Sequence, residues 1–463
     1  MSPSDRYAET AKGTVLATPA SAAAAEPSSR PSLLGRVLLI RLVVLLIALL
    51  APAVVPPYDT SALYLVHGAR GAWDSWVRAR LVPLASWDAI HFIRIAEYGY
   101  IYEKDFAFLP GYPLLMNAGA LLLRPIFSGL MSWKTLLMVS GVLVSNLSFV
   151  CAAMVLFALT RQLMPGNVSL AYAATLCFAF LPCSIIMSSI YSESSFCLFT
   201  FTGMLLLSRR QYLRAALVWS FAGLIRSNGI LYAGFFIYEL ILRRRPKRLL
   251  SRAFNVAQAI FYTGIVWSGF ALYQLYGFQL FCAPDAPSRP WCTRTVPLIY
   301  SFVQEKYWNN GFLRYYEPGQ IGNFTMAMPV AILSAVAIYQ YLSADSRRLW
   351  SLGYSSITSA ASVTGTSSAS NAPSSTKNRA GAPLESYDSI FPHIVLWLVM
   401  LVYCMTMMHV QVIIRFLSCM PGVFWYVAEW NRTRLMLGKV YVCYFVSFAL
   451  AGAVLFSAFY PPA

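Results

Sequence analysis

The sequence predicts an all-α fold, a polytopic bundle of transmembrane helices. Of its 463 residues, 58% are hydrophobic and 11% are charged, whereas a soluble domain has about 25% charged residues. Apolar segments long enough to cross a bilayer recur along the whole chain. They do not alternate polar and apolar residues as outer-membrane strands do, so helices must satisfy their backbone. At about 20 residues per span, we expect about eight to ten crossings.

The candidate spans are of two kinds. The long ones are residues 135–160, 162–192, 253–284, 318–344, 389–414 and 440–463. The short ones are residues 37–55, 106–123, 194–208 and 215–242. Residues 1–32 precede them and are rich in Ala, Ser and Pro, unlike the short basic start of a cleaved signal peptide. We predict a disordered cytosolic tail followed by a retained first span.

A second polar stretch interrupts the spans. Residues 346–390 are rich in Ser, Thr, Ala, Gly and Asn, without an apolar period, a composition typical of disorder. We predict a disordered cytosolic linker. It divides one transmembrane domain into residues 33–345 and the C-terminal helices of residues 391–463.

The charge pattern predicts the orientation of the chain. The net charge is +17, but the basic residues flank apolar windows, which indicates cytosolic loops rather than binding to nucleic acid. The densest cluster is Arg243, Arg244, Arg245, Lys247, Arg248 and Arg252. If this cluster is cytosolic, counting spans backwards places the N-terminus in the cytosol and residues 56–105 on the opposite side.

The same count meets one conflict with the positive-inside rule. It places Arg209, Arg210 and Arg214 on the non-cytosolic side if residues 170–190 and 194–208 both cross. Either these windows form a re-entrant pair or this loop is an exception. The count also places Glu193 toward the cytosol.

Two loops on the non-cytosolic side have a distinct composition. Residues 56–105 hold six of the 18 acidic residues of the chain and are rich in aromatics, as expected of a working surface. Residues 281–322 combine charges with Trp and Tyr side chains, which favour the membrane interface. Cys282 and Cys292 lie in this second loop, and they can pair only in an oxidising compartment. The sequence leaves this disulfide open.

The first of these loops carries the densest group of chemically useful side chains. Residues 87–97 contain no Gly or Pro and predict a short interfacial helix that Gly99 ends. Asp88 and His91 are three residues apart and share a face of this helix. On the pattern alone, Asp88 is better explained as the helix cap than as a catalytic base.

Ionisable residues inside apolar windows form the second group. Glu193, Arg226 and Arg415 each cost several kcal/mol if they face lipid, so they must face a polar interior. Pairing within the bundle and substrate binding explain them equally well. The four histidines of the chain form no close pair and no zinc-type spacing, which predicts no metal site.

Several blocks of the sequence resemble the PIG-V (GPI mannosyltransferase 2) family. The first runs from Trp87 and Asp88 through residues 95–103 to 106–113. The others follow in the same order at residues 191–193, 226–229, 290–292, 297–301, 307–313, 320–324 and 409–417. The resemblance covers most of residues 87–420. The loop before Trp291 is shorter than is typical of the family, and the Ser-rich linker has no counterpart in its pattern.

The resemblance implies a GT-C type enzyme of the endoplasmic reticulum membrane with a lumenal active site. Such an enzyme transfers the second mannose, α1,6-linked, from dolichyl phosphate mannose to a mono-mannosylated GPI precursor. The Trp87–Asp88 pair is then catalytic, with Asp88 as the single general base of an inverting reaction, because the lipid phosphate leaves without an acid.

The resemblance also implies which residues contact the substrates. Arginines suit the donor phosphate, with Arg226 and Arg415 as first candidates and Arg94 as the third. The further substrate-binding candidates are His91, Glu193, Asn228, Trp308, His409 and Gln411. No cofactor beyond the lipid-linked donor is expected. The partners are the donor and acceptor lipids, and a small accessory membrane subunit stays open.

Two other functions fit parts of the sequence. A different transferase that uses dolichyl phosphate mannose, acting on N-glycan precursors, would need the same donor site. A non-enzymatic lipid transporter would also carry charges inside its spans, but the inverted halves typical of transporters are not visible.

Overall fold

The computed structural model describes residues 32–59, 61–244, 246, 248–283, 289–345 and 383–460. The predicted disordered tail therefore lies outside the described residues except for Ser32, as does the linker up to residue 382. The prediction of disorder is wrong for the end of the linker. Residues 384–390 form two 3-10 turns, because Leu384 and Ile390 are buried against the bundle.

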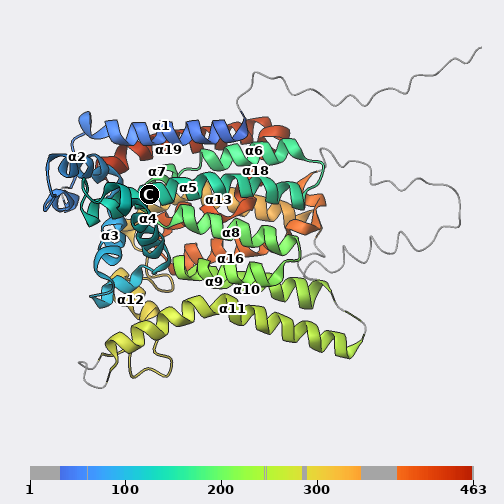
Figure 1. The fold of residues 1–463 in the computed structure, drawn as a ribbon. Coiled ribbons are helices and arrows are strands. Elements are labelled where there is room, and N and C mark those ends of the chain that lie inside the picture. The colour runs from blue at the N-terminus through green and yellow to red at the C-terminus, as the bar shows by residue number, and fades with distance from the viewer. Residues whose placement is uncertain are drawn as a thin grey trace, which may run out of the picture.

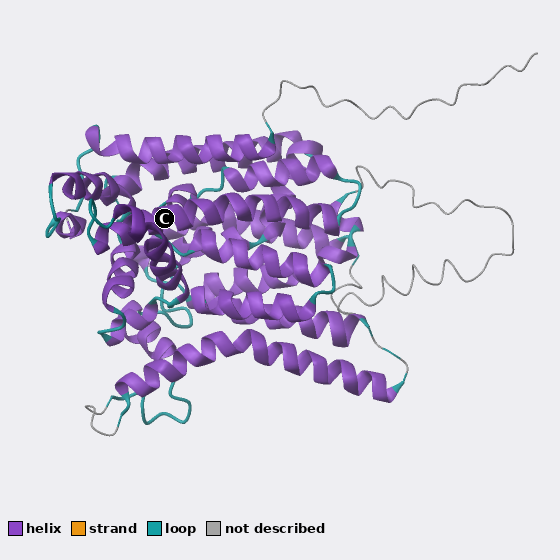
Figure 2. Cartoon of the chain, viewed as in Figure 1, coloured by secondary structure: helices purple, strands orange, loops and turns teal. Residues whose placement is uncertain are grey.

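The predicted class, a helical transmembrane bundle, is confirmed. Helices and loops make up the described part of the chain, which contains no strand (Figure 2). The long helices are α1 (Leu33–Leu50), α5 (Trp133–Leu163), α11 (Leu249–Phe281), α13 (Ile321–Ser343), α16 (Phe391–Met407) and α19 (Leu435–Ser457). Within the described ranges, six helices are long and apolar enough to cross a membrane. The number is seven if residues 410–419 and α18 (Pro421–Thr433), which meet at a bend of 87°, are counted as one span. The chain is a multi-pass membrane protein.

Three shorter apolar helices lie among these long ones, namely α6 (Val168–Ala179), α8 (Glu193–Ser208) and α9 (Tyr212–Ile225). At 1.5 Å per residue, the 16 residues of α8 extend about 24 Å, less than the hydrocarbon thickness of about 30 Å. The expected eight to ten spans are reached only if these helices count. α8 begins at Glu193 and α9 ends beside Arg226, and these two charged residues pair in the interior of the bundle.

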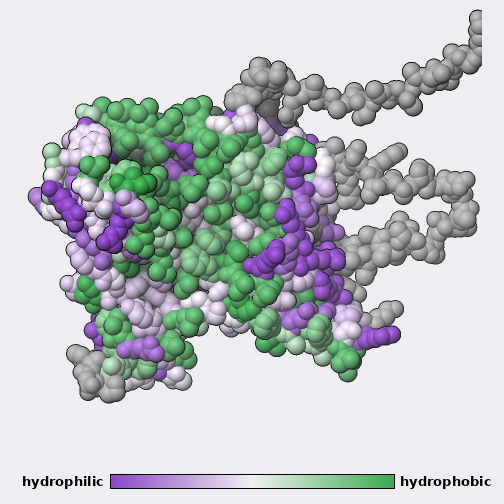
Figure 3. All heavy atoms as spheres, in the orientation of Figure 1, coloured by the Kyte–Doolittle hydropathy of each residue, from purple (hydrophilic) through white to green (hydrophobic). Residues whose placement is uncertain are grey.

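The conflict with the positive-inside rule is resolved because residues 106–123 do not cross and residues 212–243 run into the bundle and return to the same end. From the end of α5 the chain enters through α6, turns at α7 (Ser184–Ser188) and returns along α5 in α8. The α8–α9 turn lies beside the basic cluster, because the Arg244 guanidinium donates to the Tyr212 hydroxyl at 2.6 Å. Arg209 and Arg210 therefore share the basic end, where hydrophilic surface gathers at the right of Figure 3. The predicted cytosolic-side position of Glu193 is wrong, because α8 begins inside the bundle.

Arg41 of α1 supports the break between α6 and α7. Its buried guanidinium donates to the carbonyl oxygens of Ala179 at 2.7 Å and Ser184 at 2.9 Å, and to the Ser188 hydroxyl at 3.2 Å. It also lies 3.9 Å from the ring centre of Phe149. A helix that ends inside a membrane leaves carbonyl groups without partners. Arg41, which the sequence did not single out, supplies those partners.

Short helices gather at the opposite end of the bundle (Figure 1). They are α2 (Ala72–Leu81), α3 (Asp88–Tyr98), η4 (Glu103–Ala107) and α12 (Ile299–Trp308). The predicted interfacial helix is thus confirmed as α3, and Gly99 with φ 77° follows its last residue. The window at residues 106–123 does not cross. Its helix α4 (Gly111–Phe127) folds back along α5, and the Tyr112 hydroxyl donates to the Gly141 carbonyl at 2.9 Å.

Replacing Arg41 by Met should destabilise the bundle by about 2–3 kcal/mol, since hydrogen bonds from a charged group are lost and buried carbonyl groups remain unpaired. Thermal unfolding of the purified protein in detergent measures the effect. Arg36→Met is the matched control on the same helix, because Arg36 is only partly buried and packs over Tyr172. Equal unfolding temperatures for both variants would contradict the role given to Arg41.

Candidate active site

A cavity of about 770 Å³ opens at the end of the bundle that carries α3 and α12. Its wall combines α3, the segment after α9, α12 and the bent segment before α18. The polar residues that line it are Asp88, Ser192, Arg226, Ser227, Asn228, Tyr300, Gln304, Asn310, His409 and Arg415. The cavity therefore joins charged and amide side chains from segments far apart in the sequence.

Asp88 lies in the first turn of α3, and its position is fixed by the conformation and contacts of the backbone around it. Trp87 before it adopts φ 56°, a left-handed conformation that costs a residue with a side chain about 1–3 kcal/mol. The Tyr191 hydroxyl accepts from the Asp88 amide and donates to the Ser86 carbonyl, both at 3.1 Å. The Asp88 carboxylate caps no helix amide but accepts from Arg415 at 2.9 Å. The capping interpretation is therefore wrong.

Glu193 is the fully buried centre of the charged group. One of its oxygens accepts from Arg226 at 2.6 Å and from Nε of Arg415 at 2.7 Å. Arg415 then reaches Asp88 with its other nitrogen. Two carboxylates and two guanidinium groups thus form one chain of contacts with no formal net charge. This pairing offsets part of the cost of placing the charges in an apolar bundle.

Six of the predicted site residues line the cavity, namely Asp88, Arg226, Asn228, Trp308, His409 and Arg415. Glu193 lies behind the two arginines. The His409 Nε2 atom is 2.8 Å from the Trp308 carbonyl oxygen, which ties the two residues together. The Asn228 Oδ1 atom is buried without a hydrogen-bond partner among the described residues. A buried acceptor of this kind requires a donor, and a sugar hydroxyl can supply one.

The other four predicted residues do not line the cavity. Trp87 donates from Nε1 to the Tyr460 carbonyl at 3.1 Å, and Gln411 lies outside the wall. His91 stacks on Phe108 with 4.6 Å between ring centres, and burial, with a smaller effect of Arg94, lowers the pKa of His91. Arg94 is ion-paired with Asp105. These contacts occupy Trp87, His91 and Arg94, so the structure supports a positioning role for those three rather than direct contact with substrate, whereas the Gln411 Oε1 atom is buried without a hydrogen-bond partner among the described residues.

Comparisons with known proteins identify the family of this chain. The family model described as Mannosyltransferase (PIG-V) matches residues 31–463. The chain belongs to this family. The human protein named GPI alpha-1,6-mannosyltransferase 2 is 32% identical, over 87% of this chain and 84% of the relative. The GPI mannosyltransferase 2 of Schizosaccharomyces pombe is 31% identical, over 88% of this chain and 79% of the relative.

Membership of the PIG-V family makes the protein a glycosyltransferase. Among solved structures, the oligosaccharyltransferase of Archaeoglobus fulgidus is similar over 92% of this chain and 53% of its own length. The TM-score is 0.40 and the identity 14%, which is too weak a likeness to assign an architecture. The GT-C architecture therefore stays a prediction.

The PIG-V fold brings further residues to the cavity that the sequence did not assign. Gln304 and Asn310 line it together, with the Asn310 Nδ2 atom donating to the Gln304 Oε1 atom at 2.7 Å. The Asn310 Oδ1 atom is buried and unpaired within the described ranges. Tyr191 and Asn310 lie inside blocks that resemble the family. Their position in those blocks was the sequence signal that could have identified them as site residues.

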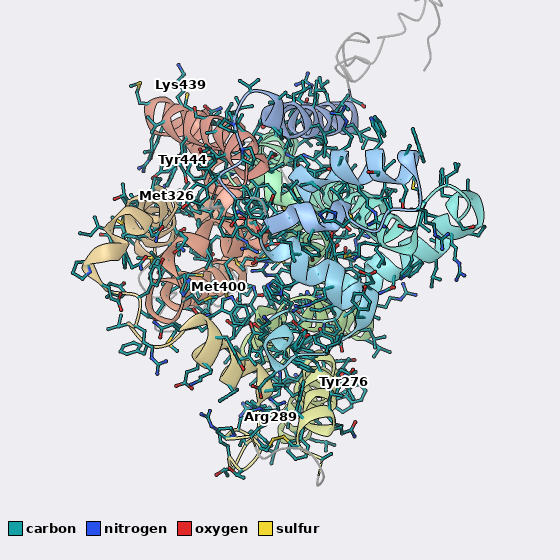
Figure 4. All side chains as sticks on the ribbon, turned by 90° about the vertical axis from the view of Figure 1, so that its left-hand side faces the viewer. Tyr276, Arg289, Met326, Met400, Lys439 and Tyr444 are labelled. Atoms are coloured by element: carbon teal, nitrogen blue, oxygen red, sulfur yellow. A yellow bond between two sulfur atoms is a disulfide. The ribbon has the colours of Figure 1, made fainter. Side chains whose placement is uncertain are left out.

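A second cluster joins the two loops that frame the cavity. Glu103 accepts from the Trp291 indole at 2.6 Å and from the Tyr307 hydroxyl at 3.0 Å. The structure joins Cys282 and Cys292 in a disulfide with 5.7 Å between Cα atoms, visible near Arg289 in Figure 4. The contacts of Glu103 thereby fix residues 291 and 307 of the second loop against the loop that carries Asp88.

Metal binding was not predicted for this chain. In the described part of the protein, no three His, Cys, Asp or Glu side chains come together in a way that could hold an ion. The absence of a metal site stays a prediction.

The charged group leads to a stability prediction for Glu193→Gln. Losing this carboxylate leaves Arg226 without its partner and Arg415 with Asp88 alone, so the variant should lose about 3–5 kcal/mol of stability. The unfolding temperature in detergent is the measurement. Glu305→Gln is the control, since Glu305 pairs with Arg314 at 3.1 Å and both side chains are exposed, where such pairs contribute about 0–1 kcal/mol. Similar losses in both variants would argue against a central role for Glu193.

Proposed function

We propose that this enzyme transfers the second mannose of a GPI anchor precursor. The donor is dolichyl phosphate mannose, the acceptor carries one mannose, and the new linkage is α1,6. Family membership and the names of the relatives support GPI biosynthesis and the linkage. The single observation that carries the mechanism is the carboxylate of Asp88 at the cavity wall, held between Arg415 and a strained turn.

Asp88 acts as the general base in this mechanism. The acceptor hydroxyl oxygen attacks the anomeric carbon of the mannosyl phosphate and gives its proton to the carboxylate. The bond between that carbon and the phosphate oxygen breaks, and its electron pair leaves with dolichyl phosphate. Only Oδ2 of Asp88 binds Arg415, and Oδ1 has no hydrogen-bond partner among the described residues. One free carboxylate oxygen is what a single base requires.

The two arginines of the charged group receive the donor phosphate. Arg226 uses Nη1 on Glu193, and its other nitrogens make no hydrogen bond within the described ranges. Its guanidinium also lies 4.5 Å from the ring centre of Phe416, which fixes its plane. A planar guanidinium with free donors suits a phosphate better than an ammonium group does. No cofactor other than the donor is needed for this reaction.

The site faces the lumen of the endoplasmic reticulum in this proposal. The basic surface, which gathers at the other end of the bundle, is expected on the cytosolic side. The disulfide at residues 282 and 292 lies at the cavity end and requires an oxidising compartment. Both substrates are lipids, so an active site within a membrane protein can receive them without taking them out of the bilayer.

The base assignment predicts that Asp88→Asn lowers kcat by about 10²- to 10⁴-fold, the usual contribution of general-base catalysis. The measurement is mannose transfer from the lipid donor by the purified variant. A cell that carries only this variant should accumulate a GPI precursor with one mannose. Asp59→Asn, in an exposed part of the same loop, is the control and should keep full activity. Undiminished transfer by Asp88→Asn would overturn the mechanism.

The phosphate assignment predicts a different pattern for Arg226→Lys. The lysine keeps the charge but loses the planar donors, so the KM for the donor should rise about tenfold with a smaller change for the acceptor. Steady-state kinetics with each substrate varied in turn measures this split. Arg432→Lys at the basic end is the control. A rise in the acceptor KM alone would place Arg226 at the acceptor instead.

A further inference from the structure

An apolar groove of about 700 Å³ lies between two walls of the bundle. One wall runs through η5 (Ser227–Tyr232), α10 (Ala233–Phe236) and η6 (Ile237–Arg243), and the other is α16. Of the side chains that line it, only Tyr238 carries a polar atom. Figure 1 shows α10 and α16 near each other in the lower part of the bundle. The groove can therefore hold a hydrocarbon but no polar group of any size.

The two segments that form the walls of this groove also contribute residues to the active-site cavity. Ser227 and Asn228 line the cavity, and Leu231 lines the groove about one helical turn further along the same segment. Met408 lines the cavity at the end of α16, and Val399 lines the groove on the same helix. The groove and the cavity thus lie along the same two segments of the chain.

The far part of the groove is closed by ring contacts. The Tyr238 ring packs on Phe391 with 5.6 Å between ring centres, so the two walls meet there. At about 1.5 Å per residue, the wall from Leu231 to Leu242 extends about 16 Å from the cavity toward the basic end. The Ile237–Arg243 stretch is a π-helix, a widened form that is frequent at functional sites.

We propose that this groove binds the polyisoprenyl chain of the donor, an inference that rests on the proposed function. The donor is an anionic phosphate with a long apolar chain, and it needs a cation directly beside an apolar channel. Arg226, which lines the cavity, immediately precedes η5, the segment that begins one wall of the groove. Asp88, which receives the acceptor, belongs to α3 and not to either groove wall. The geometry assigns the groove to the donor rather than to the acceptor.

Gly234 makes the groove testable. It lines the groove and is exposed, and a Cβ atom built on it would meet nothing within 4 Å. A side chain at this position therefore begins in open space, and we expect leucine to narrow the groove. Gly264 of α11 is the matched control, because its added Cβ also meets nothing within 4 Å and it lines no described pocket.

The experiment compares two donors with the full-length enzyme in detergent micelles. One is mannosyl phosphate on a long polyprenol, and the other is a short-chain, water-soluble prenyl analogue. We expect Gly234→Leu to lower kcat/KM for the long-chain donor about tenfold, through KM, and to leave the short-chain donor within twofold. Gly264→Leu should change neither value, and Gly234→Ala should fall between wild type and Gly234→Leu.

Three outcomes would overturn the groove assignment. The first is unchanged kinetics of Gly234→Leu with both donors, which would leave the groove to bulk lipid. The second is an equal loss with both donors, which would indicate a change in the active site itself. The third is an increase in the acceptor KM alone, which would assign the groove to the acceptor's acyl chains. The proposed function fails separately, if wild-type enzyme uses neither mannosyl donor.

Discussion

The buried carboxylate of Glu193 is the group on which the site depends. It lies at the start of a helix that is too short to cross the membrane, and it binds arginines from two other segments. A charge in this position is tolerated only if it is paired, because lipid and apolar side chains cannot solvate it. Each arginine in turn needs a counter-charge for the same reason. The three segments therefore hold one another in register around the cavity.

The irregular backbone of the bundle follows from this requirement. A continuous helix through residues 168–208 would bury its middle against α5 and offer no free end for a carboxylate. The break between α6 and α8 creates such an end, and Arg41 satisfies the carbonyl groups that the break exposes. Non-helical backbone at membrane depth is stable only where protein groups or water satisfy it. The polar interior and the break in the helix therefore depend on each other.

The balance of charge also suits the chemistry that we propose. The resting site holds two carboxylates and two guanidinium groups, so a phosphate enters an arrangement that already contains its cations. Electrostatic interactions act more strongly in a site that excludes water. The strained turn at Trp87 and the bond from Tyr191 fix the Asp88 backbone before any substrate arrives. Preorganisation of this kind supplies catalysis where a site has only one base.

The sequence by itself determined the class of fold, the basic end of the bundle, the short helix after Asp88 and the charged residues that must avoid lipid. These features depend on composition and local pattern, which a single chain displays directly. Only the tertiary structure decided that Glu193 belongs with Asp88, that residues 106–123 do not cross, and that Arg94 is occupied by Asp105. The energetic cost of a charge in lipid shows that it needs a partner, but not which partner. Asp88 and Arg415 are 327 residues apart, and their contact depends on the depth at which each helix stops.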